Sequence, residues 1–307
     1  MRRSKALALA LVGGFVAACG NSGDDDSSSK RGGERDYALV VAAGDIVCQP
    51  DDEVTDVDCQ HEAVADLAES LEPDHVFALG DLQYPHGEAA NFETGYDKTW
   101  GRFKAITTPV PGNHEYDDGT GAGYYAYWGH DAHPPNGYYS FDIAEFGWHV
   151  VALNTNCKSV PCGVDSEQEK WLRADLAANN SQCTIAITHH PLEASGRHGG
   201  SGSIKPLIDA LEDDGGHLVL SAHDHLYERF APRNGITHFV VGTGGKSHYA
   251  VEELAEGSEF VDTTHFGVIE LQLRSGAYSW RFVTIDGEAI DKGEGTCAGS
   301  EARVDDA

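Results

Sequence analysis

Short runs of apolar and β-branched residues recur along the chain, and helical patterns lie between several of them. Runs of this length and composition are typical of buried strands. We expect strands at residues 37–43, 75–79, 107–110, 148–153, 184–188, 217–220 and 238–241. Apolar residues at helical spacing predict helices over 60–71, 96–106, 166–178 and 203–212, the third opened by a Ser166-x-x-Glu169 capping box. This alternation of strands and helices predicts an α/β fold.

The pattern changes after residue 261. Residues 266–273 and 278–285 alternate between apolar and polar positions, and Ser275-Gly276 lies between them. Strict alternation is typical of antiparallel strands with one buried face, and Ser-Gly favours a turn. We therefore expect an antiparallel pair that completes a second sheet.

The first residues of the chain have the layout of a secretory signal. Basic residues Arg2, Arg3 and Lys5 precede an apolar stretch over 6–18, which is shorter than the about 20 residues that a membrane span needs. Val16-Ala17-Ala18-Cys19 resembles a bacterial lipobox, in which Cys19 carries the lipid. We expect an exported bacterial lipoprotein on a membrane facing the periplasm or the cell surface, anchored only through Cys19. Ordinary cleavage and free secretion is the alternative.

Composition then suggests where the folded part begins and ends. Residues 20–36 are polar and charged without an aliphatic side chain, so they cannot bury a core. We expect a signal peptide at 1–18, a lipidated Cys19 and flexible tether at 19–36, a catalytic domain at 37–292 and a polar tail at 293–307.

Six further cysteines remain after Cys19, and an even number in an exported chain suggests disulfides. Six cysteines allow 15 pairings, so the sequence does not fix the connectivity. Proximity along the chain favours Cys48 with Cys59, Cys157 with Cys162, and the remaining Cys183 with Cys297. A thiolate metal site is the alternative, but no CxxC pair occurs.

The formal net charge is −29, which makes nucleic acid an improbable partner for the body of the protein. An anionic substrate would need local positive charge. Few basic residues stand near the motifs described next, so bound metal ions are expected to supply that charge.

Polar clusters follow five of the expected strands, at the chain positions where open α/β sheets place their ligands. They are Gly44-Asp45, Gly80-Asp81-Leu82-Gln83-Tyr84, Gly112-Asn113-His114-Glu115, His189-His190-Pro191 and His223-Asp224-His225. Taken singly, a Gly-Asp pair indicates a turn, and a loop histidine indicates a local hydrogen bond. Their joint occurrence predicts a site for two metal ions.

The clusters together resemble the calcineurin-like metallophosphoesterases, and Tyr84 is similar to the tyrosine of the purple acid phosphatase branch. The resemblance covers roughly residues 37–285 and implies a four-layer α/β/β/α sandwich of two mixed β-sheets flanked by helices. It implies one metal ion held by Asp45, Tyr84, His225 and a bridging Asp81, and a second held by Asp81, Asn113, His189 and His223. Because His190 stands beside His189, the histidine assignment is open to a shift by one residue.

The same resemblance implies an acid phosphatase that hydrolyses small phosphate monoesters by a metal-bound hydroxide, without a phosphoenzyme. His114 and His198 resemble outer-sphere histidines that bind phosphate and protonate the leaving group, although His198 in a Gly-rich loop is also explained as a surface residue. Phenolate is a hard donor, so we expect Fe(III) together with a divalent Fe, Zn or Mn.

Two other functions stay open from the sequence. A phosphodiesterase acting on nucleotide or lipid head-group diesters would use the same two metal ions. A surface lipoprotein that only binds metal would need neither His114 nor an open coordination position. The natural substrate and the oligomeric state are not determined by the sequence.

Overall fold

The computed structural model describes residues 35–251 and 253–297, and every element named below lies in the unit that begins at Asp36. The expected signal peptide, the lipidated Cys19 and nearly all of the tether lie outside the described residues, as does the end of the tail. Within the described part, no helix is both long enough and apolar enough to cross a bilayer.

The first sheet has six strands in the order β13-β12-β11-β1-β2-β3. Its strands are β1 (Ala38–Ala43), β2 (His75–Leu79), β3 (Thr107–Val110), β11 (Gly267–Arg274), β12 (Ala277–Thr284) and β13 (Ala289–Thr296). Strands β1, β2 and β3 run parallel, and the last three strands join them antiparallel. The sheet is therefore mixed, and its parallel half carries three of the polar clusters.

The second sheet has seven strands in the order β10-β8-β9-β7-β6-β5-β4. They are β4 (Tyr139–Ile143), β5 (Trp148–Ala152), β6 (Cys183–Ile187), β7 (Leu218–Ser221), β8 (Tyr227–Phe230), β9 (Thr237–Val241) and β10 (Ser258–Asp262). Its centre, β5-β6-β7-β9, is parallel, and antiparallel strands flank it on both sides.

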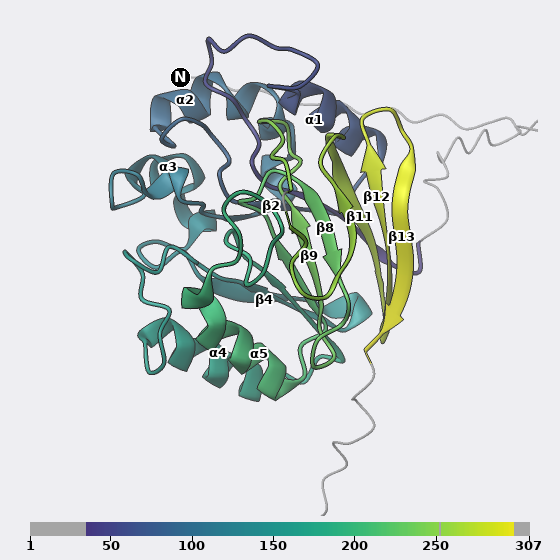
Figure 1. Cartoon of the computed structure of the whole chain (residues 1–307). Helices are drawn as coiled ribbons and strands as arrows, with labels where there is room; N and C mark the ends of the chain where they lie inside the picture. The colour runs from purple at the N-terminus through teal and green to yellow at the C-terminus, as the bar shows by residue number, and fades with distance from the viewer. Residues whose placement is uncertain (1–34, 252, 298–307) are drawn as a thin grey trace, which may run out of the picture. The chain divides into compact units, whose positions relative to one another are not determined.

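The two sheets pack face to face around an apolar core, and helices cover their outer faces. Tyr227 of β8 and Phe282 of β12 stack across the core with ring centroids 4.1 Å apart. Leu172 of α4 (Glu167–Ala178) and Leu207 of α5 (Lys205–Asp214) pack with Val219 in a second apolar cluster over the seven-stranded sheet. In Figure 1, α1 (His61–Ser70) lies on the opposite side from α4 and α5. This is the four-layer α/β/β/α sandwich that the resemblance implied.

The prediction of one α-helix over residues 96–106 is wrong. Two 3-10 segments, Tyr96–Lys98 and Trp100–Ile106, occupy it instead, and they meet at Thr99. Tyr96, Trp100 and Phe103 are buried at helical spacing, so the apolar pattern is real. The hydrogen bonding differs because two glycines lie in or beside the segment and the Tyr96 N–H donates to the Gln83 side chain instead (2.8 Å).

The sequence pattern also missed several elements. Two short helices, α2 (Ala89–Thr94) and α3 (Ala122–Trp128), and four strands, β4, β8, β10 and β13, were not expected. The domain boundary expected at residue 292 falls inside β13, whose residues look polar because the strand lies at the edge of its sheet. The folded unit therefore continues beyond that boundary.

All three expected disulfides are present. Cys48 pairs with Cys59, Cys157 with Cys162, and Cys183 with Cys297. The last bond joins residues 114 positions apart, from the start of β6 in one sheet to the end of β13 in the other. Because these cysteines are oxidised, none of them offers a thiolate ligand.

Candidate metal centre

The expected metal ligands follow the carboxyl ends of five parallel strands. Asp45 follows β1, Asp81 follows β2 and Asn113 follows β3 in the first sheet. His189 follows β6 and His223 follows β7 in the second sheet. Because parallel strands end at one edge of a sheet, and the two sheets face each other, ligands from distant segments meet at one place.

The backbone is unusually close-packed and strained where the two sheets meet. The Gly44 N–H donates across to the Val241 carbonyl (2.9 Å), and a Cβ at Gly44 would lie 2.5 Å from the Ala222 side chain. Asp45, Asp81 and His223 all have positive φ, at 57°, 49° and 74°. Non-glycine residues adopt this region at a cost in energy, and such strain clusters at functional sites.

One group of donors surrounds the Tyr84 hydroxyl. Its oxygen lies 2.9 Å from Asp45 Oδ1, 3.3 Å from Asp81 Oδ2 and 3.0 Å from His225 Nε2. His225 is held in turn through Nδ1, which lies 2.8 Å from Ser247 Oγ. Two carboxylates, a phenol and an imidazole therefore converge from three segments of the chain.

A second group surrounds His189 Nε2. This nitrogen lies 3.3 Å from Asp81 Oδ2, 3.1 Å from Asn113 Oδ1 and 3.2 Å from His223 Nδ1. His189 Nδ1 lies 2.9 Å from the Leu79 carbonyl, which can only accept, so Nδ1 carries a hydrogen and Nε2 is the nitrogen that offers a lone pair to the group once it is deprotonated. Asp81 belongs to both groups, and all seven expected ligands are thus brought together.

His189, rather than its neighbour His190, lies at the centre of this second group. His190 Nδ1 is 2.9 Å from Thr155 Oγ1, and the His190 ring lies beside that of His223. A group of three histidines, His189, His190 and His223, still offers nitrogens within 4.8 Å of one another. Asp81 contacts only the first of the three as an ion-pair partner, which supports the assignment to His189.

Burial and the charges of neighbouring residues shift the pKa values of the ionisable groups in the cluster. Burial works against ionisation of Asp45 and Asp81, yet His225 and His189 respectively hold the pKa of these carboxyls below its usual range. Burial also opposes charge on His189, but Asp81 raises the pKa of that imidazole to about 9. Burial and the neighbouring His189 lower the pKa of His223 to about 4. The cluster is therefore a set of buried, strongly interacting ionisable groups, as expected of a functional site.

The donor set suits metal ions. Asp45 and Asp81 are 0% and 2% exposed, and within the described residues their ion pairs are with histidines and not with lysine or arginine. Asn113 Oδ1, the Asp81 carboxylate and the His189 lone pair are all acceptors that face one another, so the arrangement needs a shared proton or a cation. Mixed oxygen and imidazole donors fit first-row transition metals.

His114 and His198 lie at the edge of the cluster. A carbonyl, that of Pro85, contacts His114 Nδ1, so this nitrogen carries a hydrogen and Nε2 is directed to the site, 3.8 Å from Asp81 Oδ2. His198 is exposed, and its ring centroid lies 4.7 Å from that of His223. Both expected outer-sphere histidines are therefore next to the expected metal ligands.

Two buried carboxylates that position the ligand loops were not identified from the sequence. Glu115 accepts the backbone N–H groups of Asp81 (2.9 Å), Leu82 (2.9 Å), Gln83 (3.2 Å) and Gly112 (2.7 Å). Burial, with Asp81 adding to it, raises the pKa of Glu115 to about 7. The cluster Gly112-Asn113-His114-Glu115 contained this residue, but sequence spacing does not show which loop it fixes.

The second such carboxylate is Asp224, between the two ligand histidines of its cluster. It accepts the backbone N–H groups of His198 (2.8 Å) and Gly199 (2.9 Å). It therefore holds the Gly-rich loop, and with it His198, against the metal ligands. The position of Asp224 between His223 and His225 was the only sequence signal for this role.

Two basic side chains near the cluster were also missed. Lys246 Nζ lies 5.5 Å from the centre of the Tyr84 ring, and Arg197 lies over Tyr249, whose ring stacks on His225 at 4.0 Å. Loops bring these residues in from other parts of the chain. These two side chains would add to the positive charge that bound metal ions are expected to supply.

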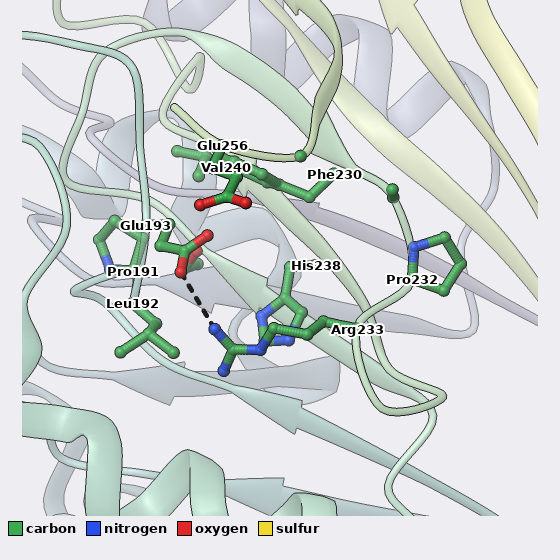
Figure 2. Close-up of a pocket in the computed structure, with 12 residues that line it drawn as sticks. Pro191, Leu192, Glu193, Phe230, Pro232, Arg233, His238, Val240 and Glu256 are labelled. Atoms are coloured by element: carbon green, nitrogen blue, oxygen red, sulfur yellow. Dashed lines mark hydrogen bonds and ion pairs between the residues drawn. The ribbon is translucent and has the colours of Figure 1, made fainter. Parts of the chain in front are cut away.

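A separate hollow of about 350 Å³ lies on the outer face of the seven-stranded sheet (Figure 2). Its wall begins at Pro191, directly after the histidine pair, and includes Glu193, which pairs with Arg233 (3.0 Å). His238 of β9 also lines it, and burial lowers the pKa of this imidazole to about 4. None of the seven expected ligands lines this hollow, so it is distinct from the metal centre.

A comparison with family models identifies the family of this chain. Residues 38–227 match the family model described as calcineurin-like phosphoesterase. The chain belongs to the calcineurin-like phosphoesterase family. The matched segment begins at β1 and ends in β8, so it contains all seven expected metal ligands. A dimetal site is typical of this family, and no match was found among curated proteins.

Solved structures of the family share the fold at low sequence identity. A purple acid phosphatase from yellow lupin (Lupinus luteus) seeds is 19% identical, with a TM-score of 0.68 over 86% of this chain and 54% of that one. A dimetal phosphatase from Danio rerio is 12% identical, with a TM-score of 0.59 over 86% and 100%. GAP50, the anchor in the inner membrane complex of Plasmodium, is 16% identical, with a TM-score of 0.62 over 85% and 89%.

These likenesses establish the metallophosphoesterase fold. The chain spans about half of the length of the lupin enzyme. Because one structural neighbour is described as an anchor and another as a phosphatase, the shared fold does not decide the activity. The activity has to be argued from the residues of the site itself.

Proposed function

We propose that this calcineurin-like phosphoesterase is a dinuclear metal-dependent acid phosphatase that hydrolyses small phosphate monoesters. The observation that supports this most strongly is the convergence of potential metal-binding atoms around Asp81, which contacts both the Tyr84 and the His189 groups. A carboxylate shared by two groups of metal-binding residues suits two cations held side by side.

In this proposal Asp45, Tyr84, His225 and Asp81 hold one metal ion, and Asp81, Asn113, His189 and His223 hold the other. Two bound ions would supply Lewis-acid chemistry, lowering the pKa of water and neutralising charge on the phosphoryl group. The protein's own part is to hold the seven donors rigidly, and Glu115 and Asp224 do this through the backbone of the ligand loops.

The two outer-sphere histidines, His114 and His198, are placed to act on the phosphoryl group and on the leaving group. The oxygen of water bonds to phosphorus and the water gives up a proton to solvent, while the ester P–O bond breaks and the leaving alkoxide takes a proton to become the alcohol. His114 is placed to give that proton from Nε2, because Nδ1 donates to the Pro85 carbonyl and Nε2 is directed to the site, 3.8 Å from Asp81 Oδ2. His198, on its Asp224-held loop, is placed to bind a phosphoryl oxygen.

We expect His114→Ala to lower kcat on an alkyl phosphate by about 100-fold or more, the range of general acid catalysis. The loss should be smaller on nitrophenyl phosphate, because its phenolate leaves without needing a full proton. Steady-state kinetics on both esters measures this. His130→Ala, which removes an exposed histidine of another segment, serves as the control and should leave both rates unchanged. Equal losses on both esters would contradict the acid role.

We further propose that the Tyr84 group holds Fe(III) and that the other ion is divalent Fe, Zn or Mn. A phenol among oxygen donors supports a hard trivalent ion. Tyr84→Phe is therefore expected to abolish the visible absorption band of iron-loaded protein, whereas Tyr138→Phe, a tyrosine that packs on Trp171, should keep it. Elemental analysis together with an absorption spectrum checks this, and full activity in colourless, iron-free protein would refute it.

A comparison of a monoester with a diester tests the proposed function. Protein loaded with iron and zinc should release phosphate from nitrophenyl phosphate faster than it cleaves bis(nitrophenyl) phosphate. The reverse order would favour a phosphodiesterase acting on nucleotide or lipid head-group diesters. No turnover of either ester would favour a surface protein that only binds metal.

We also propose that the protein is exported and anchored to a membrane through lipidated Cys19. The three disulfides support an oxidising compartment outside the cytoplasm. Mass spectrometry of the mature protein tests this. An acylated N-terminal Cys19 is expected, and a mature chain that begins elsewhere without lipid would contradict the proposal.

A further inference from the structure

A hollow of about 630 Å³ opens beside the metal centre. One wall is the loop after β6, with Ser195, Gly196 and Arg197, and the other is the segment after β9, with His248 and Tyr249. The first wall leads directly into His198, and the second contacts His225. A molecule in this hollow would therefore lie next to groups that the proposed reaction uses.

Tyr249 presents an aromatic face to this hollow. Its ring lies parallel to that of His225, with centroids 4.0 Å apart and planes 11° apart, so one face is covered. The His198 ring meets it edge-on at 5.3 Å. Its backbone N–H donates to the His225 carbonyl (3.0 Å), which fixes the tyrosine against the metal ligand. The other face of the ring is on the side of Arg197, which lines the hollow together with Tyr249.

Arg197 lies over that side of the tyrosine. Its guanidinium carbon is 5.8 Å from the centre of the Tyr249 ring, and no ion pair joins Arg197 to a carboxylate of the described residues. A planar guanidinium stacks on aromatic rings, and so does a phenol. Tyr249 and the exposed Arg197 therefore provide two surfaces on which a planar ring can stack.

From this geometry we infer that the site selects phosphate monoesters whose leaving alcohol carries a planar aromatic ring, as nucleoside 5′-monophosphates do. This inference rests on the proposed function. With the phosphoryl group at the metal centre, a leaving alcohol that passes His198 would reach Tyr249, because the His198 ring contacts both the His223 ring (4.7 Å) and the Tyr249 ring (5.3 Å). A ring attached to that alcohol stacks on Tyr249, and Arg197 closes over it.

A matched pair of substrates measures how much the aromatic ring contributes to kcat/KM. Adenosine 5′-monophosphate and ribose 5-phosphate break the same kind of bond and release the same kind of alkoxide, but only the first carries an aromatic base. Stacking of a base on an aromatic side chain contributes about tenfold or more in binding. We expect kcat/KM of the metal-loaded enzyme to be about tenfold higher for adenosine 5′-monophosphate.

Variants at Tyr249 and Arg197 then test whether these two side chains cause the preference for the aromatic ester. Tyr249→Leu is expected to bring the ratio of the two kcat/KM values close to one, and Tyr249→Phe is expected to keep it. Because both esters are measured on the same variant, any damage to His225 affects both rates and cancels in the ratio. Arg197→Ala, a change at an exposed position, should lower the ratio several-fold with little risk to folding.

The outcomes separate this inference from the proposed function. If both esters are hydrolysed with a ratio near one, or if Tyr249→Leu leaves a high ratio unchanged, selection by Tyr249 is refuted and the phosphatase stands. If the metal-loaded enzyme hydrolyses neither ester nor nitrophenyl phosphate, the proposed function and this inference both fall.

Discussion

Asp81→Asn is expected to lower kcat/KM for phosphate monoesters by about a thousandfold and to reduce the metal content of the purified protein. Asp81 contacts both groups of metal-binding residues, so this change removes the one negative charge that they share. Lewis-acid stabilisation by metal ions contributes several kcal/mol, and about 4 kcal/mol corresponds to about a thousandfold in rate. Elemental analysis and steady-state kinetics on the same preparation measure both effects.

Asp165→Asn provides a matched control. Asp165 also has a positive φ, 63°, but it is exposed and belongs to neither donor group. Asparagine tolerates the left-handed conformation, so neither change should strain the backbone. Asp165→Asn is expected to keep full metal content and activity. A metal-replete, active Asp81→Asn protein would contradict the shared-carboxylate assignment.

Removal of the Cys183–Cys297 disulfide is expected to cause the largest loss of stability. Its closed loop of about 114 residues restricts the unfolded chain, and a loop of this size contributes about 4–5 kcal/mol in the chain-entropy model. For a domain of this size each kcal/mol corresponds to about 2–4 °C, so the double change to serine should lower Tm by about 10 °C or more. Thermal unfolding of the metal-loaded protein measures this.

The Cys157–Cys162 disulfide is the internal control. Its sequence separation is only 5, for which the same model gives about 2 kcal/mol. The double serine variant at this pair should therefore lose about half as much stability or less. If the two variants unfold at the same temperature, the long-range bond between the sheets does not contribute in this way.

The sequence predicted the buried parallel strands because their apolar residues are continuous. β1, β2, β6 and β7 are covered on both faces, so each reads as an apolar run. The missed strands have other surroundings. β8 carries Glu228, a buried carboxylate that accepts a hydrogen bond from the Ser195 N–H. β13 lies at the edge of its sheet and carries glycines and charged residues. Neither pattern indicates a strand before the partner strand is known.

The sequence by itself determined which residues could bind metal, since their chemistry and their places after buried strands are local properties of the chain. Proximity along the chain favoured the disulfide partners but left the connectivity open, and the structure shows the three expected pairs. Tertiary structure alone decided that His189, and not His190, faces Asp81, and that Arg197, Lys246 and Tyr249 lie beside the ligands. These contacts join segments that are far apart in the chain, and their geometry depends on how the two sheets pack.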